Sequence, residues 1–194
     1  MKLLGPIVRL QVQLASLKVA GKRFERYDMS PLTEAAGLIV TDGGVHGVDS
    51  AGGRLADVHH RDHPASKYRE ENALSIGFTG HYRLMRERFG EKLTDGIAAE
   101  NILVDFPGRV TEAEIAAGLM IETADGRQLD LYEVIAAAPC APFTRFALSY
   151  PETEKPDRTV TEGLQFLHHG TRGFYARFAG PETLIAVGDR LYIR

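Results

Sequence analysis

The chain has 194 residues, the usual length of one domain, and we expect residues 1–194 to form a single unit. Hydrophobic residues make up 44% of it and charged residues 25%, a composition that supports a buried core and argues against global disorder. With 23 Lys and Arg against 26 Asp and Glu, the formal net charge is -3. No basic excess is present for binding phosphates, so nucleic acid is not an expected partner.

The chain has one cysteine, Cys140, which rules out an internal disulfide and suits a reducing compartment. No apolar run approaches the roughly 18 residues that a membrane-spanning helix needs. The first residues also lack the apolar core and cleavage site of a signal peptide. We therefore expect a cytoplasmic protein with no membrane partner.

Alternation of side chains predicts a half-buried strand over residues 5–17, with Ile7 on one face and Val8 and Leu10 on the other. Ser30 followed by Pro31 predicts the N-cap and first residue of a short helix. A strand over 37–40 follows.

Glycine is so frequent between residues 41 and 54 that this stretch predicts a tight loop rather than a regular element. Residues 57–72 are polar and rich in titratable groups, and alternation returns over 73–78. Tyr82, Met85 and Phe89 then recur at helical spacing, which predicts one short helix that Gly90 ends.

The C-terminal half favours strands. Five runs have strand length and composition: 102–104, 119–121, 129–134, 173–178 and 183–193. Asp125-Gly126 predicts a hairpin turn, and Thr111 with Glu114 forms the capping box of a short helix over 111–117. The Pro-bearing, charged stretch 151–162 predicts a loop. Together these elements indicate a mainly β fold, most economically a barrel with a few short helices.

Cys140 lies between Pro139 and Pro142, which predicts a rigid loop at the end of a strand. A thiol held in this way meets a soft metal or an electrophilic sulfur at fixed geometry. The alternative is a buried and inert cysteine.

Three histidines, His59, His60 and His63, stand near Asp57 and Asp62. These are metal-ligating residue types, but there is neither an HExxH motif nor a second cysteine to complete a zinc site. We expect a solvated polar loop here.

Arg172 lies between two glycines in the stretch Gly170–Gly173, where a guanidinium can approach a phosphate and bind it with two hydrogen bonds. An exposed arginine in a turn is the alternative. The motifs GxGxxG, GxxxxGK[ST] and GxSxG are absent, which disfavours nucleotide binding and the common serine hydrolases.

Several segments, taken in order, resemble one family, the MOSC domains, named for the C-terminal domain of molybdenum cofactor sulfurases. The matching segments are Gly5–Leu10 with Ala15–Lys18, Gly44–Asp49, Ala99–Ile102, Pro139-Cys140, Gly173–Arg177 and Val187–Asp189. The likeness spans nearly the whole chain. Three segments depart from the family pattern: the family's Gly-Asp-Arg is here Val48-Asp49-Ser50, its Gly-Glu-Asn is Ala99-Glu100-Asn101, and its Gly-Asp is Gly118-Leu119. Ser50 thus stands where the family has arginine.

The resemblance implies a MOSC-type β-barrel that binds a pterin-based molybdenum cofactor (molybdopterin). It implies that Cys140 is the molybdenum ligand or carries sulfane sulfur. The other residues assigned to cofactor binding are Lys18, His46, Asp49 and Asn101, with Arg172 added from the phosphate chemistry above. A surface position for Lys18 and a turn-closing role for Asn101 are the structural alternatives.

The function that the resemblance implies is that of a small molybdenum-dependent oxidoreductase or a sulfur-transfer partner acting through Cys140. One such activity is the reduction of N-hydroxylated compounds, as in the mitochondrial amidoxime-reducing component. A non-catalytic carrier of the cofactor or of sulfane sulfur, or a fold that has lost its site, is the alternative. The chain has no room for a cysteine desulfurase domain, so we expect a small-molecule substrate and a redox partner or a cysteine desulfurase.

Overall fold

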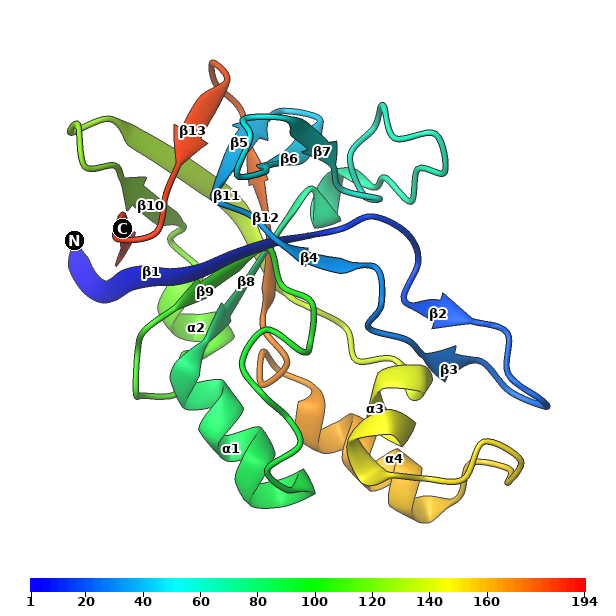
Figure 1. Ribbon diagram of the computed structural model, residues 1–194. Helices are drawn as coiled ribbons and strands as arrows, with labels where there is room; N and C mark the ends of the chain where they lie inside the picture. Colours follow the sequence, from blue (N-terminus) through cyan, green and yellow to red (C-terminus); the bar gives the residue numbers. More distant parts are fainter.

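The computed structural model describes all 194 residues and has a closed barrel of seven strands at its centre (Figure 1). In spatial order these strands are β1 (Lys2–Gln13), β14 (Arg190–Ile193), β10 (Leu119–Glu122), β11 (Gln128–Ala136), β12 (Phe174–Phe178), β8 (Leu74–Phe78) and β9 (Ile102–Val104). Strand β9 pairs with β1 and completes the ring. Neighbours are antiparallel except β8 and β9, which run parallel. The expected barrel is thus confirmed.

Strand β1 contains a β-bulge that changes which of its side chains point inward. Val8 has no partner between the pairs Ile7–Val104 and Arg9–Leu103. A bulge inserts one residue into the alternation, and for this reason Ile7 and Leu10 are both fully buried. The expected strict alternation, which placed Ile7 and Leu10 on opposite faces, is wrong at this point.

The glycine-rich stretch forms strands instead of the expected loop. Strands β5 (Gly37–Thr41), β6 (Gly44–Val48) and β7 (Arg54–Ala56) pair in sequence, and β13 (Thr183–Ile185) joins β5. A Cβ on Gly47 would lie 3.1 Å from the side chain of Val12. Glycine at this position therefore serves the close packing of β6 on β1.

The helix expected to begin at Pro31 is also wrong. Residues Leu32–Glu34 form strand β4, which pairs with the end of β1 that extends beyond the barrel. The free edge of β1 offers backbone hydrogen bonds that override the local capping signal. Between β1 and β4 the chain forms a small hairpin of β2 (Lys18–Val19) and β3 (Arg26–Tyr27).

Two helices agree with expectation. Helix α1 (Thr79–Phe89) ends at Gly90, whose φ is 99°, and α2 (Glu112–Ile115) has the capping box of Thr111 and Glu114. The turn at Asp125-Gly126 joins β10 to β11 as expected.

Two further helices and a 3-10 turn lie where loops were expected. Helix α3 (Ala141–Leu148) begins directly after Cys140, and α4 (Arg158–Leu167) begins after Asp157, which accepts hydrogen bonds from the N–H groups of its first turn. Residues Glu70–Asn72 form the 3-10 turn η1. No helix has both the length and the apolar character needed to span a membrane.

The core has two parts. Twenty-five buried residues form a cluster that includes the barrel strands and the four-stranded sheet. A second cluster of 12 buried residues lies between the barrel and the helices, and Phe143 of α3 meets Tyr27 edge to face in it, with 5.1 Å between ring centroids. Helices α1, α3 and α4 gather at one end of the barrel and the four-stranded sheet at the other (Figure 1). Cys140 packs against the second cluster, which places it at the helical end.

Candidate functional site

Cys140 is the residue that precedes the first turn of α3. Its backbone is extended (φ -122°, ψ 149°), and its carbonyl oxygen accepts hydrogen bonds from the N–H and the hydroxyl of Thr144, each at 3.0 Å. Pro142 fits the first turn of the helix because its missing N–H has no partner to lose there. The thiol is half-buried on the wall of a cleft.

This cleft has a volume of about 570 Å³ and is lined by residues from four parts of the chain. They are the end of β1 with the β2–β3 hairpin, the loop 58–72, the segment 138–140, and the residues Arg172 and Tyr175 at β12. Of the residues assigned to the site from sequence, Cys140, Lys18 and Arg172 meet in it. Such a volume lies within the range of small-molecule sites.

Arg172 forms part of the inner wall. Its Nη2 donates to the carbonyl oxygen of Ala98 at 2.9 Å, while its Nε is buried and has no partner in the protein. Burial by itself would lower the pKa of this guanidinium, but Tyr175, Cys140 and Tyr27 beside it raise that pKa above its ordinary value. Arg172 is thus a permanent cation next to the thiol.

The charge of the cleft is predominantly positive. Lys18, Lys67, Arg69 and Arg172 line it, against the single carboxylate of Glu71. Low-dielectric walls strengthen the field of such a cluster, so the cleft attracts anions. Lys67 and Arg69 lie in the loop that the sequence identified only as polar.

Behind Arg172 lies a recess of about 20 Å³ that Glu100 also borders. The Oε2 atom of Glu100 accepts a hydrogen bond from the hydroxyl of Tyr82 at 2.8 Å, and its Oε1 atom has no partner. Burial raises the pKa of Glu100 to about 7, although the hydrogen bonds and the charge of Arg172 oppose this shift. The floor of the site thus contains a carboxyl group that titrates near neutral pH.

Asn101 is buried behind the cleft and does not line it. Its Oδ1 accepts from the N–H and hydroxyl of Ser75, and its Nδ2 donates to the carbonyl of Gln11 and to Asp57. Both ends of the amide are therefore occupied by protein groups. Asn101 connects β1, β8 and the loop that begins at Asp57.

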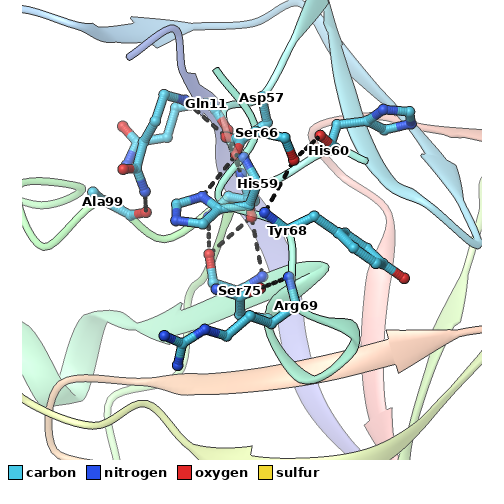
Figure 2. Close-up of polar contacts among 12 residues, drawn as sticks. Gln11, Asp57, His59, His60, Ser66, Tyr68, Arg69, Ser75 and Ala99 are labelled. Atoms are coloured by element: carbon cyan, nitrogen blue, oxygen red, sulfur yellow. Dashed lines mark hydrogen bonds and ion pairs between the residues drawn. The ribbon is translucent and has the colours of Figure 1, made fainter. Parts of the chain in front are cut away.

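Asp57 belongs to the same hydrogen-bond network and also contacts His59 (Figure 2). This contact was not predicted from the sequence. Asp57 is buried and its Oδ1 lies 2.9 Å from Nδ1 of His59, whose imidazole lines the cleft. The only sequence signal was the Asp-x-His spacing within a stretch that is polar throughout.

His46 and Asp49 lie outside the cleft. The ring of His46 packs against that of His60 with 4.0 Å between centroids and 54° between the ring planes, and burial lowers the pKa of both histidines. Asp49 accepts hydrogen bonds from the N–H groups of Ala51 and Gly53, each at 2.8 Å, and so closes the turn between β6 and β7. Neither side chain is placed to contact a ligand beside Cys140.

No three or more His, Cys, Asp or Glu side chains are grouped so as to hold a metal ion. His60 and His63 each accept a backbone N–H at Nδ1 within their own loop. A metal at Cys140 would therefore need most of its ligands from a bound molecule.

The structure is thus a closed β-barrel with a cationic cleft, and the wall of this cleft carries the single thiol of the chain. The sequence model of the MOSC domain matches residues 42–192, and the chain belongs to the MOSC domain family.

Solved structures show the same fold at low sequence identity. The structure of the YUAD protein from Bacillus subtilis is similar with a TM-score of 0.50 and 15% identity, over 95% of this chain and 96% of that one. A structure described as a hypothetical protein gives a TM-score of 0.54 and 11% identity, over 96% of this chain and 65% of that one. A comparison with curated protein sequences gives no match.

Proposed function

We propose that the cleft binds the pterin-based molybdenum cofactor and that the protein acts through Cys140 as a small molybdenum-dependent oxidoreductase or a sulfur-transfer partner. The observation that carries this proposal is the position of the only thiol on the wall of a cationic cleft, next to Arg172. Membership of the MOSC family supplies the connection to molybdenum cofactor chemistry.

The residues present fit such a group. A thiolate is a soft ligand suited to a sulfur-bound metal, and Cys140 is accessible from the cleft. A phosphate can bind the cationic side chains of Lys18, Lys67, Arg69 and Arg172, which line the cleft. When bound, the cofactor supplies a redox-active metal, while the protein binds it, orients it and shields it.

Among the predicted residues, Cys140, Lys18 and Arg172 form the contacting set of this proposal. Asn101 enters it as the residue that holds β1, β8 and Asp57 together, without contacting the ligand. His46 and Asp49 are not included, because they lie outside the cleft. A redox partner or a cysteine desulfurase, and a cytoplasmic location, complete the proposal.

The test is metal analysis of protein purified from a host that makes the cofactor. We expect about one molybdenum per chain in the wild type and a loss of most of it in Cys140→Ser, whose side chain has nearly the same size. Ser149→Ala is a control that changes a hydroxyl at the far end of α3. Equal molybdenum content in the wild type and Cys140→Ser would show that the thiol does not hold the metal.

Two measurements separate the enzyme from the carrier. Turnover of an N-hydroxylated compound with reduced methyl viologen as electron donor supports the oxidoreductase. A persulfide on Cys140 in protein without molybdenum, detected by mass spectrometry, supports the sulfur carrier. A protein that shows neither turnover nor a persulfide supports the alternative of a MOSC fold without a functional site.

A further inference from the structure

The cleft wall carries one histidine, His59, and the hydrogen bonds behind it determine where its protons lie. We propose that His59 is the proton-transfer group of this cleft and that Asp57 is the positioning residue that sets its tautomer. This inference rests on the proposed function for its substrate, but the state of the imidazole is testable without it.

The first step concerns the amide of Asn101. Its Oδ1 faces the backbone N–H of Ser75, which can only donate, and its Nδ2 faces the carbonyl of Gln11, which can only accept. These two contacts fix the orientation of the amide. The contact of 3.1 Å between Nδ2 and Asp57 is therefore a hydrogen bond donated to the carboxylate.

The second step concerns Asp57. Its Oδ2 accepts from Asn101 and from the N–H of Gln13 at 2.8 Å, and its Oδ1 accepts from the N–H of His59 at 2.8 Å. All three partners can only donate, so both carboxylate oxygens act as hydrogen-bond acceptors. Its remaining partner, Nδ1 of His59, therefore carries a proton and donates it at 2.9 Å.

The third step concerns the other nitrogen. With the proton of the neutral ring on Nδ1, the Nε2 atom of His59 has a free lone pair. No protein group bonds Nε2, and the side chain has an exposed fraction of 26% on the cleft wall. His59 is thus arranged as an acid and base that exchanges its proton at Nε2 only.

This arrangement suits the reductive cleavage of an N–O bond. Reduction of an amidoxime, R–C(NH2)=N–OH, consumes two electrons and two protons and gives the amidine, R–C(NH2)=NH, and water. The N–O bond breaks, and the electrons come in the end from a low-potential one-electron donor. His59 gives its Nε2 proton to the departing oxygen, returns to the neutral ring and regains a proton from solvent, which also supplies the second proton.

Nitrogen-15 NMR of the purified chain tests the tautomer directly, without molybdenum. At about pH 8.5, where imidazoles are neutral, we expect the His59 signal to show Nδ1–H and an unprotonated Nε2. His60 and His63 are internal controls with the opposite expectation, because Nδ1 of each accepts a backbone N–H. His59→Ala assigns the signal, and an Nε2–H tautomer of His59 would overturn the inference.

Turnover of the cofactor-loaded protein tests the role itself, with benzamidoxime as substrate and reduced methyl viologen as donor. We expect His59→Ala to lower kcat by about 100-fold with bound molybdenum unchanged, and added imidazole to restore part of the rate. His63→Ala, in the same loop but off the cleft, should keep the wild-type rate.

The two proposals fail in different ways. Loss of molybdenum from His59→Ala, or a kcat equal to that of the wild type, overturns the proton-transfer role and leaves the proposed function intact. A wild-type chain that binds no molybdenum, or binds it without turnover, overturns the reductase and with it this role for His59. The NMR result then still decides which tautomer His59 holds.

Discussion

The guanidinium of Arg172 lies over the ring of Phe143, with its carbon 5.6 Å from the ring centroid. Phe143 belongs to the first turn of the helix that begins after Cys140, whereas Arg172 stands just before β12. The contact therefore holds a cation from one segment beside a thiol from another.

Replacing Arg172 by Met removes this cation while keeping a long side chain. Because the cleft attracts anions, we expect the ratio of Cys140 alkylation rates for iodoacetate and for neutral iodoacetamide to fall about three- to tenfold at low salt. Mass spectrometry of the single thiol gives both rates. Arg88→Met, on the exposed side of α1, is the control, and an unchanged ratio in Arg172→Met would show that Arg172 exerts no field at the thiol.

Glu100→Gln should change how stability depends on pH. The pKa of Glu100 is raised from 4.5 to about 7 in the folded chain, so the contribution of this group to the free energy of unfolding is fully present below about pH 4.5 and is lost as the pH rises through about 7. Glutamine cannot ionise, and at about pH 8.5 the variant should be more stable by on the order of 2 kcal/mol.

Urea unfolding at about pH 4.5 and 8.5 measures this difference, with the exposed Glu91→Gln as control. The increase in the free energy of unfolding caused by Glu100→Gln should occur only at the higher pH. An equal effect at both values would attribute it to packing and not to ionisation.

Ala99→Gly should leave stability nearly unchanged. Ala99 has a φ of 69°, a left-handed conformation that costs a residue with a Cβ about 1–2 kcal/mol. Glycine removes this cost, but it loses about 0.5–1 kcal/mol more backbone entropy on folding and gives up a buried methyl group worth about 0.8 kcal/mol, so the three contributions should nearly cancel. Ala113→Gly, in the regular helix α2, should instead lower stability, and the same result from both variants would contradict the role of φ.

Asn101→Ala should be strongly destabilising, by on the order of 3 kcal/mol, because it leaves buried partners of four hydrogen bonds unsatisfied. Ser75→Ala removes one hydroxyl from the same network and should cost about 1 kcal/mol. The double variant should cost less than the sum, since the two side chains share a bond. Additive costs in urea unfolding would mean that Asn101 and Ser75 act independently.

Local signals predicted the elements that depend on local chemistry. The helical spacing of Tyr82 and Met85, the capping box at Thr111 and the Asp125-Gly126 turn each need only neighbours in sequence, and each is found. Strand β4 failed because its partner is β1, which no local pattern reveals. Helix α4 was missed although Val160, Leu164 and Leu167 recur at helical spacing, since the prolines and charges before them indicated a loop.

The sequence predicted only part of the residues that line the cleft. The family resemblance pointed to Cys140 and Lys18, phosphate chemistry pointed to Arg172, and all three line the cleft. His59, Lys67 and Arg69 reach the cleft because the loop 58–72 folds over the end of β1. That arrangement depends on the buried hydrogen bonds of Asp57 and Asn101, which link residues far apart in the chain.

The ring closes where Lys2 pairs with Ile193, so the two ends of the chain are neighbours in space. A short linker can therefore join them, and a new start can be opened in the exposed stretch between α3 and α4 without separating any pair of barrel strands. Such a circularly permuted chain would keep Cys140 on one side of the new opening and Arg172 on the other. It would show whether the cleft needs the covalent connection between α3 and α4 or only the barrel that supports both.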